Sequence, residues 1–163
     1  MVHDSVFSGS VAETYDRYMG PLVFAPYAEE VASRAATFMP GHILETAAGT
    51  GIVTQALHHK LPDAEIIATD LNQPMLDVAA QRVRSDKVSF EVGDAQELRF
   101  ADESFDLVVC QFGVMFFPDK VRGNPEARRV LRDGGRYLLV IWDHIERNLA
   151  TMTAGRAVAE LIP

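Results

Sequence analysis

The feature that most constrains the fold is a short apolar run that ends in an acid and continues into a turn of small residues. Residues 43–46 read Ile-Leu-Glu-Thr, and Ala-Ala-Gly-Thr-Gly follows at 47–51. Apolar residues then recur at helical spacing from Val53 to Leu61. Because glycine has no side chain and adopts backbone angles closed to other residues, Gly49 and Gly51 let a ligand lie on the main chain where the helix starts. The pattern predicts a strand, a tight turn and a helix, with a site for a nucleotide-like molecule at the turn.

A second apolar run, at residues 64–69, ends in Asp70. Asp70 follows Gly51 by about 20 residues, the interval at which a nucleotide-binding βαβ unit places a carboxylate on the ribose hydroxyls. The alternative role for Asp70 is to cap the next helix, whose first turn contains Pro74. Asn72 is available as that cap, which would leave Asp70 free for a ligand.

The rest of the chain continues the alternation of strands and helices. Further apolar strands are expected at 87–92, 105–110 and 136–142, and helices at 26–38, 124–132 and 148–162. Strands that alternate with helices and are apolar throughout predict an α/β fold. We expect a doubly wound, mostly parallel, Rossmann-like sheet of about five strands in a three-layer αβα arrangement, with ligands bound beyond the carboxyl ends of the strands.

These motifs resemble those of the class I S-adenosylmethionine-dependent methyltransferases, in particular the small-molecule, ubiquinone-biosynthesis-like branch. In that family an acid-x-G-x-G-x-G sequence ends the first strand, and Glu45, Ala47, Gly49 and Gly51 match it here, with Ala47 in place of the first glycine. The sequences GDA at 93–95 and VLRDGGRYLLV at 130–140 are similar to two later elements of the family.

The resemblance implies S-adenosylmethionine as the cofactor and assigns residues to its parts. Glu45 and the glycines would frame the amino-acid end, Asp70 the ribose, and Asp94 with its neighbour the adenine. The full set of expected cofactor-binding residues is Tyr15, Glu45, Ala47, Gly49, Thr50, Gly51, Asp70, Leu71, Asp94, Ala95 and Gln111.

Some of these side chains have equally ordinary explanations. Tyr15 either closes over the methyl donor, as the resemblance implies, or packs an N-terminal helix on the sheet. The aromatic and apolar residues after the fourth strand either line the methyl-transfer pocket or belong to the core; they are Phe112, Met115, Phe116 and Phe117. Cys110 is expected to be a buried small apolar residue.

The expected topology separates the histidines into those near the ligand and those far from it. His42, His58 and His59 should lie at the edge of the sheet opposite the ligand, whereas His144, beside Asp143 just after the fifth strand, and His3 could reach a substrate. His144 is therefore the one candidate catalytic acid or base, against the alternative of an ordinary loop pair. No metal-ligand cluster is expected.

Length and composition limit the number of domains and the kinds of partner that the chain can have. The chain has 163 residues, which suits one structural domain made of an N-terminal cap and helix at 1–40 and a cofactor-binding core at 41–163. A net charge of −8 disfavours a nucleic-acid partner, and no apolar stretch is long enough for a membrane helix. A single cysteine and the absence of a signal sequence suggest the cytoplasm.

The family has a C-terminal hairpin of two more strands, which this sequence lacks. The strand at 136–142 would then be an apolar edge, so we predict a homodimer or another chain covering it; the rival explanation is a truncated copy of a longer protein. The leading function is methyl transfer to a small molecule. The alternatives are a non-catalytic S-adenosylmethionine-binding module and a nicotinamide-dependent oxidoreductase. The oxidoreductase motif requires a third glycine, and Thr54 occupies that position here.

Overall fold

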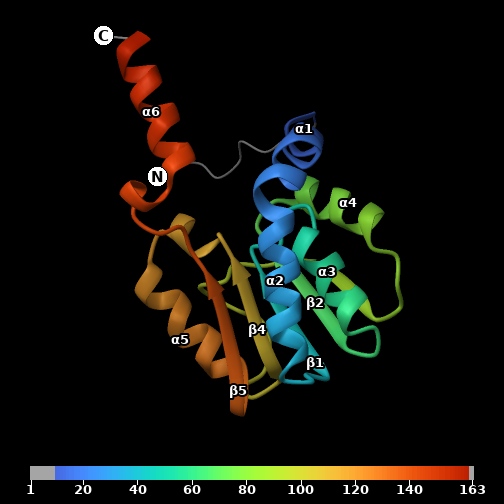
Figure 1. Ribbon diagram of the computed structural model, residues 1–163. Helices are drawn as coiled ribbons and strands as arrows, with labels where there is room; N and C mark the ends of the chain where they lie inside the picture. The colour runs from blue at the N-terminus through green and yellow to red at the C-terminus, as the bar shows by residue number, and fades with distance from the viewer. Residues whose placement is uncertain (1–9, 162–163) are drawn as a thin grey trace.

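The computed structural model in Figure 1 describes residues 10–161. Its centre is a five-stranded sheet of order β3-β2-β1-β4-β5 in which every neighbouring pair is parallel. The order of winding reverses between β1 and β4, and the carboxyl ends of strands at such a point are where ligands bind. The expected doubly wound sheet is confirmed. The strands are β1 (His42–Thr46), β2 (Glu65–Asp70), β3 (Val88–Val92), β4 (Phe105–Gln111) and β5 (Leu131–Val140).

Helices flank both faces of the sheet. Helices α2 and α3 pack on one face and α5 on the other, while α4 lies beside α3 and contacts β2 and β3 (Figure 1). The long helices are α1 (Ser10–Met19), α2 (Ala25–Ala36), α3 (Ile52–Lys60), α4 (Gln73–Arg82), α5 (Lys120–Val130) and α6 (Leu149–Leu161). The short ones are the π-helical η1 (Gly20–Phe24) and the 3₁₀ turns η2 (Val114–Phe116) and η3 (Ile145–Arg147).

The core consists of two apolar clusters, one on each side of the sheet. Ile43 and Leu107 face α2 and α3, whereas their neighbours Leu44 and Val108 face α5. This alternation follows from the two-residue period of a strand. Because both faces are covered, the strands are apolar throughout rather than at every second position. Truncating a fully buried leucine such as Leu44 to alanine costs about 2–5 kcal/mol.

The expectation that α5 begins at Asn124 and Pro125 is wrong. The helix begins at Lys120, because the Asp119 carboxylate accepts hydrogen bonds from the backbone amides of Val121 and Arg122, each at 3.0 Å. An aspartate in that position satisfies amides that have no partner inside the helix. Pro125 lies within the helix, where its missing amide proton removes one backbone hydrogen bond.

The expectation that this helix runs to residue 132 is also wrong, and the Asp133-Gly134-Gly135 turn that follows does not close it. The helix ends at Val130 and β5 starts at Leu131, so the turn lies inside the strand. Phe105 pairs with Leu131 but Leu107 pairs with Arg136, so residues 132–135 form an excursion from the ladder. Gly134 has φ 79° at this point, a conformation that glycine adopts without strain.

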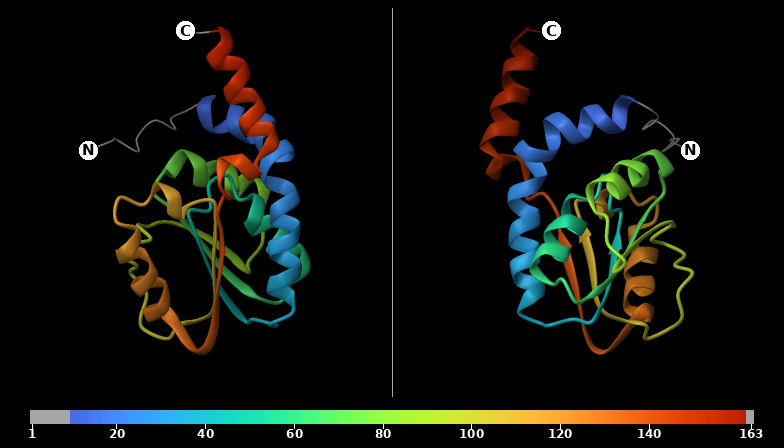
Figure 2. Two further views of the ribbon diagram at one scale, coloured as in Figure 1. Left: turned by 60° about the vertical axis from the view of Figure 1, so that its left-hand side comes forward. Right: turned by 90° about the vertical axis from the view of Figure 1, so that its right-hand side faces the viewer.

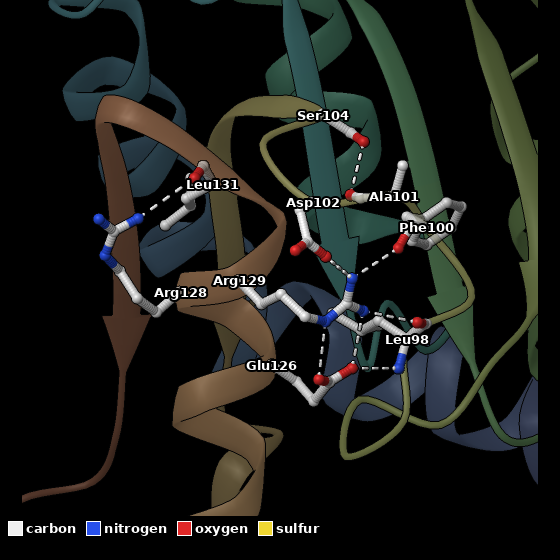
Figure 3. A network of polar contacts seen from close by, with 9 residues as sticks. All are labelled: Leu98, Phe100, Ala101, Asp102, Ser104, Glu126, Arg128, Arg129 and Leu131. Atoms are coloured by element: carbon white, nitrogen blue, oxygen red, sulfur yellow. Dashed lines mark hydrogen bonds and ion pairs between the residues drawn. The ribbon is translucent and has the colours of Figure 1, made fainter.

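The connection between β3 and β4 has little regular structure and is held against α5 by Arg129 (Figure 3). The Arg129 guanidinium donates to the carbonyls of Leu98 and Phe100, both at 2.8 Å, and to the carboxylates of Asp102 at 2.7 Å and Glu126 at 2.9 Å. These hydrogen bonds from Arg129 lower the pKa of Glu126. The network therefore holds residues 98–102 of this connection against the C-terminal part of α5.

The two ends of the described chain differ in how they meet the rest of the molecule. Helix α1 crosses above α4 at the carboxyl edge of the sheet, whereas α6 projects away from the body (Figure 2). Within residues 10–161, β5 pairs with β4 on one side and with no strand on the other, and Leu139 is 41% exposed there. Across the same residues, no helix has the length and apolar character to span a membrane.

Candidate functional site

The carboxyl ends of the strands open into a cavity of about 390 Å³. Carboxylates from successive strand tips, Glu45, Asp70 and Asp94, all line it. Of the expected cofactor-binding residues, Gly51 does not line it, and those that do are Tyr15, Glu45, Ala47, Ala95, Gly49, Thr50, Asp70, Leu71, Asp94 and Gln111. The acids that the sequence places at the strand ends therefore line one cavity.

Gly49 and Gly51 meet different structural requirements in the turn. Gly49 has φ 56°, and a Cβ built on it would meet no protein atom within 4 Å, so its free side faces the cavity. Gly51 has φ 76°, and a Cβ there would lie 2.8 Å from the Cβ of Ala79. Gly49 therefore leaves room for a ligand, whereas Gly51 leaves room for α4.

Ala47, which occupies the position of the family's first glycine, is in the left-handed region with φ 54°. This conformation costs an alanine roughly 1 kcal/mol. Its methyl group also fills the space beside Gly113, where a Cβ would lie only 2.4 Å from the Cβ of Ala47. The turn keeps its shape at a small energetic cost, and Gly113 accommodates the additional carbon.

Glu45 is buried, with 2% of its surface exposed, and lines the cavity. The Thr54 hydroxyl donates a hydrogen bond to Glu45 Oε2 at 2.6 Å. Burial raises the pKa of Glu45 to about 8, and the nearby charge of Asp70 adds to this effect. A cation in the cavity would favour the ionised form. Glu45 is thus suited to bind a positively charged group, and Thr54 orients it.

Asp70 is anchored on both of its carboxylate oxygens. Oδ2 accepts from the Gly49 amide at 2.9 Å, and Oδ1 accepts from the Asn72 amide at 2.9 Å and its side-chain nitrogen at 3.2 Å. Asn72 is the N-cap residue of α4, as expected, but its side chain makes no cap hydrogen bond and donates to Asp70 instead, so the expectation that Asp70 is free is wrong. Oδ2 accepts only one of these hydrogen bonds and has a second lone pair, so Asp70 retains acceptor capacity toward the cavity.

Asp94 and Ala95 follow β3 and lie against the same cavity. Asp94 Oδ1 accepts from the Gln96 amide at 2.8 Å and from its side-chain nitrogen at 3.2 Å. Gln96 Oε1 in turn accepts from the Asp119 amide at 2.8 Å. These contacts link the cavity to the start of α5, and the small side chain of Ala95 leaves space beside the acid.

Two polar atoms at the cavity are buried without a hydrogen-bond partner in the part of the chain that the structure describes. They are Thr50 Oγ1 and Gln111 Oε1, and both residues line the cavity. The Gln111 nitrogen is already engaged, donating to the Phe24 carbonyl at 3.3 Å. A buried polar atom without a partner costs about 1–3 kcal/mol. A ligand with polar groups at these points would remove that cost.

The other side of the cavity is apolar and aromatic. Phe112 is buried and stacks on Trp142, with ring centroids 4.0 Å apart and planes at 9°, and Tyr15 stacks on Phe24 at 5.2 Å. Phe116 also lines the cavity but is 71% exposed. The lining residues that sequence reasoning missed include Met19, Val23, Phe24, Asn72, Met75 and Trp142. Trp142 could have been found, since it follows the carboxyl end of β5.

The four histidines within residues 10–161 are not among the residues that line the cavity. His144 is exposed, and its backbone amide donates to Asp143 at 2.7 Å. Its role as an acid or base stays a prediction, and His3 lies outside the described residues. His42 starts β1 at the opposite edge, 3.5 Å from Glu65. No group of three or more potential metal ligands occurs among residues 10–161.

The fold and the cavity together define a class of protein. A parallel sheet of this order, with a small-residue turn after β1 and acids at the strand tips, is the fold of the class I S-adenosylmethionine-dependent methyltransferases. A protein from Methanococcus maripaludis that is described as an S-adenosylmethionine-dependent methyltransferase has this fold, with a TM-score of 0.75 over 85% of this chain and 66% of that chain at 23% identity. The YcgJ protein of Bacillus subtilis matches with a TM-score of 0.62 and 30% identity over 69% of this chain and 49% of its own.

A family model for the methyltransferase domain matches residues 44–139. The chain belongs to this methyltransferase domain family. Among curated relatives, the demethylmenaquinone methyltransferase of Deinococcus radiodurans is 37% identical over 136 residues, which is 80% of this chain and 56% of that protein. The enzyme of the same name from Thermotoga maritima is 35% identical over 133 residues, 80% of this chain and 57% of its own. The chain thus spans little more than half the length of these relatives.

Proposed function

We propose that this chain binds S-adenosylmethionine and transfers its methyl group to a small-molecule acceptor. The observation that carries the proposal is the convergence of Glu45, Asp70 and Asp94 on one cavity that also contains two polar atoms without a hydrogen-bond partner among residues 10–161. Carboxylates match the ammonium, ribose hydroxyls and adenine amine of this compound, all of which are hydrogen-bond donors. When bound, it supplies a methyl group already activated by a positive sulfur.

The residues of the cavity fit the parts of the donor. Glu45 and the Gln111 oxygen would accept from the ammonium group, and the Thr50 hydroxyl would donate to the carboxylate. Asp70 would accept from the ribose hydroxyls, with Leu71 beside it. The adenine would lie against Ala95, with its amine donating to Asp94, and Tyr15 would cover the donor from α1.

The apolar side of the cavity would receive the acceptor. Its rings exclude water and restrict the orientation of a bound molecule, which is the protein's main contribution when the donor is already activated. We propose a flat, largely apolar acceptor, in line with the quinones that the relatives' names specify. The exposed ring of Phe116 at the cavity's edge supports an acceptor that extends beyond it.

A second candidate is binding of the donor without methyl transfer. The lining residues within 10–161 include no histidine or lysine, and their acids, Glu45, Asp70 and Asp94, are assigned to the donor, so no described lining residue is left to act as a base toward the acceptor. A nicotinamide-dependent oxidoreductase has less support, because the position of its third glycine holds Thr54, whose hydroxyl is committed to Glu45.

We further propose that a second chain covers the free edge of β5. The support is the exposure of Leu139 at 41% and of Ile141 at 57%, along and just beyond a strand that has a strand neighbour on one side only within residues 10–161. A homodimer is the simplest form of this arrangement.

Calorimetry with S-adenosylmethionine and its demethylated product tests the proposal. We expect both to bind more tightly than a nicotinamide dinucleotide, and Asp70→Ala to weaken binding by about tenfold or more through loss of a charged acceptor. Asp63→Ala is the matched control, since Asp63 is exposed in the turn before β2. Equal affinity of the two variants would contradict the ribose assignment. Donor binding without methylation across a panel of quinone-like acceptors would favour the second candidate.

A further inference from the structure

Arg82, the last residue of α4, donates hydrogen bonds to three separate parts of the protein. Its Nε donates to the Thr50 carbonyl in the glycine turn at 2.9 Å, and Nη1 donates to Gln55 Oε1 on α3 at 3.2 Å. Its Nη2 forms an ion pair with Asp16 on α1. One side chain therefore joins the cavity's turn, the helix that follows the turn and helix α1, whose Tyr15 and Met19 line the cavity.

The contact with the glycine turn is reinforced from the same face of α4. Ala79 lies three residues before Arg82, and residues at that spacing are neighbours on a helix surface. The Cβ of Ala79 would be 2.8 Å from any Cβ at Gly51. Helix α4 thus contacts two consecutive residues of the turn, Thr50 and Gly51. This close packing fixes the position of Arg82 relative to Thr50.

The ion pair to α1 is partly buried. The side chains of Arg82 and Asp16 are 22% and 23% exposed, so water screens the pair less than it screens a surface pair. On α1, Asp16 is adjacent to Tyr15, which lines the cavity, and one turn from Ala12, which is 1% exposed. The inner face of α1 therefore carries both the ion pair and the tyrosine.

We propose that Arg82 is a positioning residue that couples the donor-binding turn to α1. It holds the Thr50 carbonyl in place, and through Asp16 it holds the helix that presents Tyr15 to the donor. The inference rests on the proposed function. Removing Asp16 leaves Arg82 bonded to Thr50 and Gln55, so the turn keeps its support while α1 loses its attachment to α4.

The test compares Asp16→Ala with Glu13→Ala. Both remove one negative charge from α1 and both introduce a good helix former, but Glu13 is exposed and has no ion pair among the described residues. Asp16→Ala should speed dissociation of S-adenosylmethionine and of its demethylated product about five- to tenfold, measured by stopped flow. It should also speed amide hydrogen exchange in residues 10–19, with and without donor. Glu13→Ala should change each rate less than about twofold.

Arg82→Ala adds loss of the Thr50 contact and should speed dissociation more than Asp16→Ala does. If circular dichroism finds that variant unfolded, Asp16→Ala carries the test alone. Identical dissociation and exchange rates in Asp16→Ala and Glu13→Ala would overturn the inference while leaving donor binding intact. Absence of donor binding by the unaltered chain would instead overturn the proposed function, and the two failures are thereby distinguished.

Discussion

At the scale of single residues, the buried Glu45 makes the stability of the protein depend on pH in a way that a surface acid would not. Burial raises its pKa from 4.5 to about 8, so the folded chain keeps a proton that the unfolded chain releases. Its contribution to stability is therefore full below about pH 4.5 and is lost as the pH rises toward 8. Urea unfolding without ligand should give a free energy of unfolding that falls over this range for the natural chain and falls less for Glu45→Gln.

The control for this measurement is Glu29→Gln, which changes an exposed acid on α2. Its pH profile should run parallel to that of the unaltered chain. If the Glu45→Gln profile is also parallel, Glu45 does not hold its proton in the folded state.

Ala47 is the second residue whose individual effect on the free energy of unfolding can be measured. Its φ of 54° strains an alanine but not a glycine. Ala47→Gly should therefore raise the free energy of unfolding by about 0.5–1 kcal/mol, despite the extra backbone entropy of glycine. Ala48→Gly is the neighbouring control: Ala48 is buried and is not among the residues with positive φ, so that change should lower stability. A loss of stability in both variants would mean that Ala47 is not strained.

At the scale of elements, the connection between β3 and β4 depends on Arg129. Arg129→Ala would leave the carbonyls of Leu98 and Phe100 without their donor, and we expect a loss of about 2 kcal/mol in urea unfolding. Arg128→Ala removes the adjacent side chain, which is 68% exposed, and should cost less than about 0.5 kcal/mol. Similar losses in the two variants would rule out a special role for the Arg129 network.

The sequence was informative wherever a local pattern determines local structure. Apolar runs located all five strands, and the acids at their ends indicated the cavity, because parallel strands bring their carboxyl ends to one edge. It was less informative where the outcome depends on competition between nearby groups. Asp119 rather than Asn124 starts α5, and the Asn72 side chain bonds Asp70 rather than capping α4.

Contacts between residues far apart in the chain had no local signal. Arg82 and Asp16 are separated by 66 positions, and neither stands in a motif. Trp142 and Phe112 stack only because β4 and β5 are neighbours in the sheet. Such pairs follow from the tertiary arrangement, which a pattern of apolar positions does not specify.

At the scale of the whole molecule, the proposal that a second chain covers the free edge of β5 predicts the oligomeric state. If a second copy covers this edge, sedimentation should give a dimer, and Leu139→Lys should shift it to the monomer, since a charge on an edge strand opposes pairing. Leu22→Lys is the control, because Leu22 is 82% exposed on η1 rather than on β5. A monomeric natural chain would contradict the dimer.

The π-helical segment η1 joins α1 to α2 without an intervening loop, and its end is marked by the Ala25 amide donating to the Gly20 carbonyl five residues earlier. The widened turn sets the rotational phase between the two helices. If the same five residues formed an ordinary α-helix, α1 would turn by about 100° about its axis relative to α2. Tyr15 and Asp16 would then point elsewhere although the sequence is unchanged, so the π-helical form of this segment is itself a determinant of where they lie.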